Sequence, residues 1–366
     1  MINSEWIDRF NHTVVAERVP VSGMIELTRH CNLRCVHCYL GQGEGRFESH
    51  REMTTEQVCD VIDQIAEAGC LYLTLTGGDP MMRRDFAEVY RHAKNQGLLV
   101  TVMCDGVLVT SEIIELFQEL PPLSVEVSVY GATASTYEAV TQVPGSFEHC
   151  IRGIRRLVEA GGFEVRLKTV LLSLNAHEAG AMRELAEGFG LRMKLDAAVF
   201  PCLHTGNTKP LDLRVPAQQV VQIELDDPQN VREWIQYLDR PSESPPSDGL
   251  YVCGAGVSAF YIDPYGFVYP CMMTTRYKYN LLESDFQTLW NDRLAELHET
   301  KARDGYECAG CELQRACASC PGLHDQEHGA EDIKSDYVCD TAKARWRALQ
   351  DPSLRATVAE HEEGTA

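Results

Sequence analysis

The chain has 366 residues, with 54 Asp and Glu against 33 Lys and Arg and a net charge of −21 at pH 7. This balance excludes the clustered positive charge that a nucleic-acid-binding surface needs. No stretch approaches the roughly 18 apolar residues of a membrane span, and the first residues lack the basic and apolar segments of a signal peptide. We therefore expect a cytoplasmic protein with neither a nucleic-acid partner nor a membrane partner.

Apolar strands alternate with amphipathic helices between residues 21 and 205. This alternation predicts an α/β fold with a parallel sheet, either an open doubly wound sheet or a partial barrel. In both folds the loops that follow the carboxyl ends of the strands build the site. The predicted strands are 23–28, 71–78, 98–106, 123–131, 163–172 and 191–199, and the predicted helices are 54–69, 83–97, 111–120, 146–161 and 176–190.

The rest of the chain divides by composition. Residues 1–20 form a short N-terminal extension, and residues 206–250 form a polar bridging region, rich in Pro and Ser, with one predicted helix at 227–239. Residues 251–345 are rich in cysteine and short of long helices, which predicts a domain held together by metal rather than by a large apolar core. Residues 346–366 form a C-terminal tail.

Fifteen cysteines are unusual for a cytoplasmic protein, because disulfides are disfavoured there and many thiols indicate metal or redox chemistry. Three of them, Cys31, Cys35 and Cys38, form an N-terminal trio in the loop after the first predicted strand. A closed zinc or iron–sulfur site takes four ligands. The trio therefore indicates either a zinc knuckle completed by His30 or His37, or an iron–sulfur cluster with one open position. Its place after the first strand of the alternating strands and helices favours the iron–sulfur cluster.

The stretches "CNLRCVHCY" and "LTGGDP" at 75–80 resemble the radical SAM superfamily. The resemblance implies a partial (β/α)6 TIM-like barrel. It also implies that the trio holds a [4Fe–4S] cluster whose open iron binds S-adenosylmethionine (SAM). Reductive cleavage of SAM then releases a 5′-deoxyadenosyl radical that abstracts a hydrogen atom from a substrate. The cofactor supplies the chemistry and the protein orients it.

Further SAM contacts follow from the same resemblance. Asp79 replaces the glutamate of the superfamily's Gly-Gly-Glu-Pro turn, and its shorter side chain weakens the case for a direct contact. Some of these positions have a simpler explanation. Gly77 and Gly78 also fit an ordinary strand-to-helix turn, and Lys168, on the fifth predicted strand, also fits a lysine that flanks the core. The residues expected to border SAM are Tyr39, Gly77, Gly78, Asp79, Ser128 and Lys168.

Seven further cysteines resemble the SPASM domain attached to many radical SAM maturases, with one interval of two residues where three are usual. The resemblance implies two auxiliary clusters, expected as [4Fe–4S], while zinc ribbons are the alternative for paired C-x2-C motifs. It assigns a four-thiol set to one cluster and leaves the other with a three-thiol set, open or completed by a ligand other than cysteine. The four-thiol set is Cys308, Cys311, Cys317 and Cys339, and the three-thiol set is Cys253, Cys271 and Cys320.

The resemblance favours modification of a ribosomally made peptide by crosslinking, epimerisation or oxidation. The alternatives are a small-molecule enzyme acting on a tetrapyrrole, a sulfatase-maturase-like protein oxidase, and a non-catalytic electron-transfer module. The few residues before the first strand predict that a separate leader-binding protein, a sheet edge or the bridging region presents the peptide. A flavodoxin- or ferredoxin-type donor is expected to supply electrons. Cys202, after the sixth strand, is a candidate hydrogen donor to a substrate radical.

Overall fold

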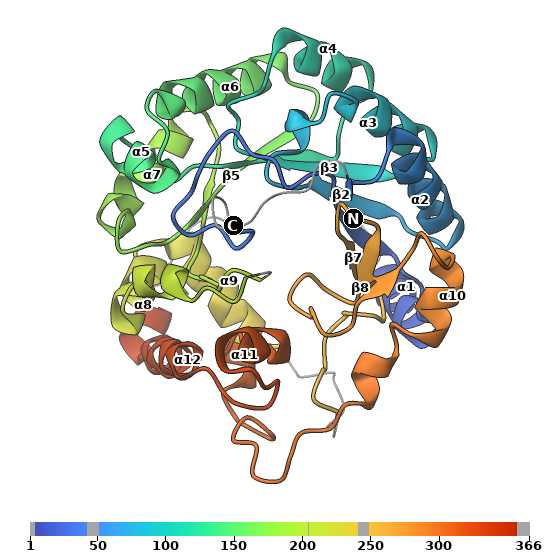
Figure 1. Ribbon diagram of the computed structural model, residues 1–366. Helices are drawn as coiled ribbons and strands as arrows, with labels where there is room; N and C mark the ends of the chain where they lie inside the picture. The colour runs from blue at the N-terminus through green and yellow to red at the C-terminus, as the bar shows by residue number, and fades with distance from the viewer. Residues whose placement is uncertain (1–3, 42–50, 204, 241–248, 357–366) are drawn as a thin grey trace.

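A nine-stranded sheet runs through both halves of the protein (Figure 1). The computed structural model describes residues 4–41, 51–203, 205–240 and 249–356. The strand order is β6-β5-β4-β3-β2-β1-β7-β8-β9, and β1 to β6 are parallel, which confirms the predicted α/β class. The strands are β1 Ser22–Glu26, β2 Tyr72–Thr76, β3 Leu99–Cys104, β4 Ser124–Ser128, β5 Glu164–Val170, β6 Met193–Asp196, β7 Ala259–Ile262, β8 Phe267–Tyr269 and β9 Tyr279–Asn280.

The helices of the N-terminal half form an outer arc around its strands (Figure 1). Within the described ranges, none of them is both long enough and apolar enough to cross a membrane. The helices are α1 Ser4–Ala16, α2 Thr55–Glu67, α3 Phe86–Asn95, α4 Ser111–Glu119, α5 Ala134–Thr141, α6 Ser146–Ala160, α7 Ala179–Glu187, α8 Ala217–Leu225, α9 Pro228–Asp239, α10 Phe286–Asp292, α11 Pro321–His328 and α12 Asp336–Leu349.

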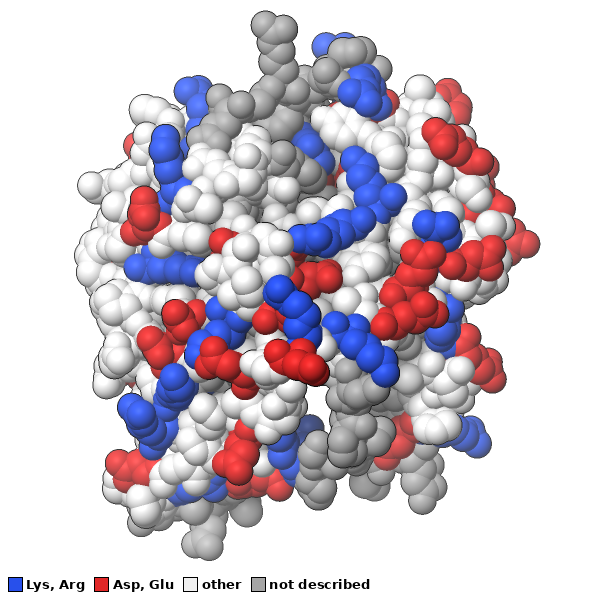
Figure 2. Space-filling view, turned by 60° about the horizontal axis from the view of Figure 1, so that its bottom comes forward, with Lys and Arg blue, Asp and Glu red and all other residues white. Residues whose placement is uncertain are grey.

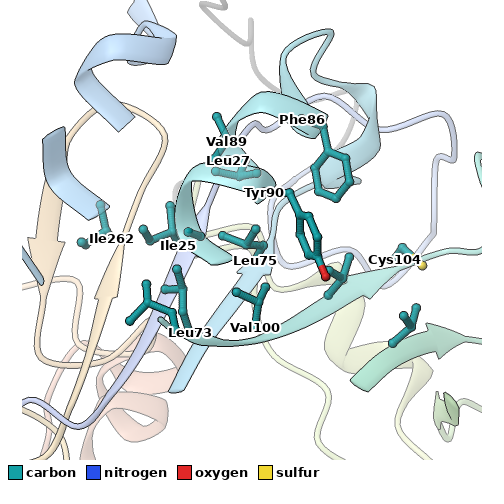
Figure 3. Close-up of a cluster of buried hydrophobic side chains, with 14 of the residues drawn as sticks. Ile25, Leu27, Leu73, Leu75, Phe86, Val89, Tyr90, Val100, Cys104 and Ile262 are labelled. Atoms are coloured by element: carbon teal, nitrogen blue, oxygen red, sulfur yellow. The ribbon is translucent and has the colours of Figure 1, made fainter. Parts of the chain in front are cut away.

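The main core lies between the sheet and this outer arc. Alternate strand residues, such as Leu75, Val100 and Val125, are fully buried and pack in one cluster with the inner faces of the helices (Figure 3). Helix α2 shows why the local sequence folds this way. Thr54 and Gln57 form a reciprocal capping box at its start, and an apolar stripe turns to the sheet.

The opposite face of the strands is polar. Because side chains alternate along a strand, the residues between the core positions point into the barrel. Glu126 and Ser128 of β4 share this inner face with Lys168 of β5 and Lys194 of β6. In the strand register, Lys168 stands beside Ser128 on one side and beside Lys194 on the other. The barrel interior is therefore a charged surface suited to a polar ligand.

The cysteine-rich half continues the same sheet. Strand β7 pairs in parallel with β1, more than 200 residues away in sequence, and β8 and β9 follow as antiparallel neighbours. The N-terminal extension strengthens this junction, because the Arg18 guanidinium donates to the carbonyls of Gly256 and Trp290, and the Trp290 indole donates to the Arg18 carbonyl at 2.6 Å. The cysteine-rich half is thus joined to the barrel through a shared sheet rather than through a linker alone.

The bridging region contains two helices where the sequence predicts one. Helix α9 matches the prediction, and α8 lies before it and packs against α12. Arg345 of α12, which is buried, forms a bidentate ion pair with Glu224 of α8 at 2.7 and 2.8 Å. Helix α12 continues past residue 345, where the sequence predicts the end of the cysteine-rich domain. The first residues of the predicted tail therefore belong to a helix that packs against the bridging region.

Candidate functional site

The trio lies in the loop that leaves the carboxyl end of β1. Helix α5 holds this loop, because the amides of Arg34 and Val36 donate to the carbonyls of Thr141 and Val140 at 2.9 and 3.0 Å. Within the loop, the Cys38 amide donates to the Cys35 carbonyl at 3.1 Å. The backbone is therefore held on both sides of Cys35.

The three thiols of the trio are brought together. Burial raises the pKa of the Cys35 thiol well above its usual value, and the neighbouring thiols of Cys38 and Cys31 raise it further. No group of three or more His, Cys, Asp or Glu in the described part of the chain is arranged around a single ion. Cysteine thiolates are the ligands of iron–sulfur clusters, so the donor chemistry of the trio fits such a cluster.

The two glycines of the 75–80 stretch let its turn press against the trio's loop. The amides of Gly78 and Asp79 donate to the carbonyls of Thr28 and His30 at 2.8 and 2.9 Å. A Cβ on Gly77 would lie 2.4 Å from the Thr28 oxygen, and one on Gly78 would lie 2.3 Å from the His30 oxygen. Only glycine permits this backbone-to-backbone approach.

Asp79 uses both carboxyl oxygens within the protein. Oδ1 accepts from the Met81 amide at 2.9 Å, which caps the short 3-10 helix Pro80–Met82, and Oδ2 accepts from the Asp105 amide at 3.0 Å. The side chain is fully buried, and this burial raises its pKa. Asp79 therefore fixes the end of β3 to the glycine turn.

Asp105 is a site residue that the sequence reasoning missed. Its Oδ2 lies 4.0 Å from the Cys31 sulfur, while Oδ1 accepts from the Val107 amide at 2.8 Å. The available signal was its position directly after β3, where the carboxyl ends of parallel strands gather site residues.

The remaining candidates for SAM contact lie on or beside the inner face. Ser128, at the end of β4, lies beside the Tyr130 hydroxyl, which is close to the trio. Lys168 places its Nζ 3.1 Å from Glu126 Oε2. Tyr39 packs in a small cluster that also includes Cys271. Tyr130 thus places Ser128 near the trio, Lys168 is the strand neighbour of Ser128, and Tyr39 shares an apolar cluster with Cys271.

A buried polar network lies behind the trio's loop at the β1–β7 junction. Glu26, 1% exposed, accepts from the Tyr261 hydroxyl and lies 3.7 Å from the Arg29 guanidinium. Arg29 in turn lies 3.9 Å from Asp263. Burial raises the pKa of Glu26 to about 7, against the lowering effect of Arg29, and the nearby carboxylates of Asp263 and Glu52 raise it further.

Replacing Glu26 with glutamine should flatten the dependence of stability on pH. The folded carboxyl binds its proton more tightly than the unfolded one, so its stabilising contribution is complete below about pH 4.5 and is lost as the pH rises to about 7. The wild type should lose about 3 kcal/mol more than the variant between pH 4.5 and 8. Anaerobic urea unfolding of the holoprotein measures this. The control is Glu148→Gln at an exposed glutamate, which should lose as much stability as the wild type over this range. Equal losses in the wild type and in Glu26→Gln would contradict the expectation.

Neighbouring thiols surround two of the C-terminal cysteines, Cys271 and Cys317. Burial raises the pKa of the Cys271 thiol to about 11, and the thiols of Cys320 and Cys253 add to the effect. Burial also raises the pKa of Cys317, and its neighbouring thiols add to it in the same way. Those neighbours are Cys308, Cys339 and Cys311. The donor chemistry of both sets fits iron–sulfur clusters.

The scattered cysteines lie in other surroundings. Cys70, Cys104 and Cys150 are buried in the main core, as expected of small apolar side chains, whereas Cys59 is half-buried. Cys202 is also buried, and its thiol donates to the Cys38 carbonyl at 3.4 Å. Cys202 thus lies directly against the trio's loop.

Two family models match the chain. Residues 25–186 match the model of the radical SAM superfamily, and residues 253–321 match SPASM, described as an iron–sulfur cluster-binding domain. The first match includes the trio and the glycine turn. The second includes six of the seven C-terminal cysteines, all but Cys339.

Curated relatives are similar along most of the chain. An AdoMet-dependent heme synthase from Methanosarcina barkeri (strain Fusaro / DSM 804) is 28% identical, and the alignment covers 81% of this chain and 89% of the relative. Mycofactocin maturase MftC from Mycolicibacterium smegmatis (strain ATCC 700084 / mc(2)155) is also 28% identical, with 81% and 77% covered.

Solved structures share the fold at lower identity. Streptococcus suis SuiB bound to precursor peptide SuiA has a TM-score of 0.69 and 16% identity over 93% of this chain and 82% of that one. Native anSMEcpe with bound AdoMet has a TM-score of 0.69 and 15% identity over 93% of this chain and 100% of that one. At these identities the similarity concerns the fold alone.

Proposed function

Because the chain belongs to the radical SAM superfamily and carries a SPASM domain, we propose that it is a maturase that modifies a ribosomally made peptide by hydrogen-atom abstraction. The modification is a crosslink, an epimerisation or an oxidation. Similarity to mycofactocin maturases supports a peptide substrate. The charge pattern inside the barrel is the main observation that favours a peptide over a tetrapyrrole.

The inner wall of β4 to β6 carries equal numbers of positive and negative side chains. Several are already paired, as in the contact of Lys168 with Glu126 at 3.1 Å. The face drawn in Figure 2 likewise intersperses Lys and Arg with Asp and Glu. A peptide offers both donors and acceptors to such a wall, whereas a ligand with several carboxylates needs uncompensated positive charge. The wall residues are Glu126, Glu164, Arg166, Lys168, Lys194 and Asp196.

The chain's own residues bind and orient the cofactors. The trio holds the [4Fe–4S] cluster, Gly77 and Gly78 press the neighbouring turn onto its loop, and Tyr39, Ser128 and Lys168 border SAM. Asp79 positions the turn through its two amide contacts rather than by touching SAM. When bound, SAM and the cluster supply the 5′-deoxyadenosyl radical. The SPASM domain binds the auxiliary clusters, through the four-thiol and three-thiol sets.

Two protein partners belong to this proposal. A separate leader-binding protein presents the peptide, and a flavodoxin- or ferredoxin-type protein donates the electron. The bridging helices α8 and α9 are the proposed contact region for the peptide, which their place beside the barrel supports (Figure 1).

A tetrapyrrole is the second candidate substrate, because the heme synthase from Methanosarcina barkeri is as similar to this chain as the maturase is. The discriminating experiment uses the reconstituted, reduced protein with SAM. One arm contains short peptides encoded beside its gene, and the other contains a tetrapyrrole bearing propionates. A mass change in the peptide, with 5′-deoxyadenosine formed above the substrate-free level, supports the proposal. A mass change only in the tetrapyrrole overturns it.

Cys202 is proposed as the hydrogen donor that quenches a substrate radical, which its place against the Cys38 carbonyl supports. With Cys202→Ala, 5′-deoxyadenosine should still form while the modified peptide is lost, as liquid chromatography with mass spectrometry would show. Formation of the normal product by this variant would remove Cys202 from the mechanism.

A further inference from the structure

The two auxiliary sites differ in their surroundings. Cys271 and Cys320 of the three-thiol set pack against a cluster of buried apolar side chains that includes Met273 and Leu323. The four-thiol set lies instead on the loop around residues 301–320 and on α12, among charged and exposed residues. The side chains around the two sets therefore differ in polarity, whichever substrate the protein takes.

Two lysines flank the four-thiol set. Cys339 and Lys343 stand four residues apart on α12, so their side chains share one face of the helix. The Lys343 ammonium is therefore close enough to the Cys339 sulfur for the two to interact electrostatically. Lys334, just before the helix, forms an ion pair with Glu307, the neighbour of Cys308. Lys334 therefore contacts the neighbour of one ligand, Cys308, and lies within electrostatic reach of another, Cys339.

The carboxylates that pair with these lysines are more exposed than the lysines themselves. The Lys334 side chain is 25% exposed, whereas Glu307 is 67% and Asp336 is 88% exposed. Lys343 is 45% exposed and its partner Asp340, at 3.6 Å, is 62% exposed. Because solvent screens exposed charges more strongly, these carboxylates are more screened than the lysines with which they pair.

Reduction adds one negative charge to a cluster. A cation held beside the ligand sulfurs stabilises the reduced form more than the oxidised form, and hydrogen bonds to those sulfurs act in the same direction. We propose that Lys343 and Lys334 raise the reduction potential of the cluster held by the four-thiol set. They are tuning residues, since they act on the cluster rather than on the substrate.

The test is a redox titration followed by electron paramagnetic resonance. The protein carries alanine at Cys31, Cys35 and Cys38, so that only the auxiliary clusters give signals. Lys343→Gln and Lys334→Gln should each shift one of the two midpoint potentials to a more negative value. Lys343→Arg, which keeps the charge, should leave that potential close to the parent value.

Arg347→Gln is the matched control. It removes one positive charge from the same helix, but eight residues from Cys339, or about 12 Å along the helix axis. A Cys253→Ser change identifies the signal of the three-thiol cluster, which the lysine variants should leave in place. If neither Lys343→Gln nor Lys334→Gln moves the four-thiol potential beyond the shift seen with Arg347→Gln, the proposal is overturned. A shift of the three-thiol signal instead would also overturn it.

Discussion

Replacing Cys35 with alanine should abolish 5′-deoxyadenosine formation while leaving the auxiliary clusters in place. Cys35 is the thiol of the trio that both Cys31 and Cys38 approach. Two remaining thiols cannot hold the cluster that binds SAM, because the open iron depends on the other three being ligated. The product should fall below detection by liquid chromatography, and bound iron should fall by about four atoms per chain.

The control for this loss is Cys59→Ala. Cys59 is half-buried on α2, away from the three cysteine sets, so its replacement should leave both 5′-deoxyadenosine formation and iron content near the wild-type values. The reading of the trio would fail if Cys35→Ala still formed 5′-deoxyadenosine. It would also fail if the variant lost all its iron, because the trio would then be part of a site shared with the C-terminal cysteines.

The alternating strands and helices were predictable because each has a local signal of its own. Helix α2 has a capping box and an apolar stripe, and the strands are rich in buried Val and Leu. Helix α5 has an N-cap, Thr133, but no capping box. Its eight residues include several Ser and Thr, which are weak helix formers, and it is held by the contacts of Thr141 and Val140 with the trio's loop.

Long-range pairing could not be predicted from the sequence. Strand β7 is four residues long, and nothing in its sequence specifies that it pairs with β1 rather than forming a separate domain. The pairing matters for function, because it places Tyr261 and Asp263 beside Glu26 and Arg29 directly behind the trio's loop. The sequence motifs indicated the cysteines, whereas the carboxylates and tyrosines around them became visible only in three dimensions.

Alanine at Gly78 should damage the site more than its single added carbon suggests. The new Cβ would lie 2.3 Å from the His30 carbonyl oxygen and 2.7 Å from that of Arg29. Both oxygens belong to the backbone of the trio's loop, so no side chain can move aside to relieve the contact. We expect a loss of about 3 kcal/mol in the free energy of unfolding, at the upper end of typical overpacking costs.

The displaced loop should also weaken SAM binding and cluster retention, measured by equilibrium dialysis and iron analysis. Gly180→Ala, in helix α7, is the matched control, because its Cβ would meet nothing within 4 Å. Alanine there favours the helix and should stabilise the protein by about 0.5–1 kcal/mol. Opposite signs for the same chemical change would separate the steric role of Gly78 from the general effect of replacing glycine. Normal stability and SAM binding in Gly78→Ala would show that the turn does not support the trio's loop.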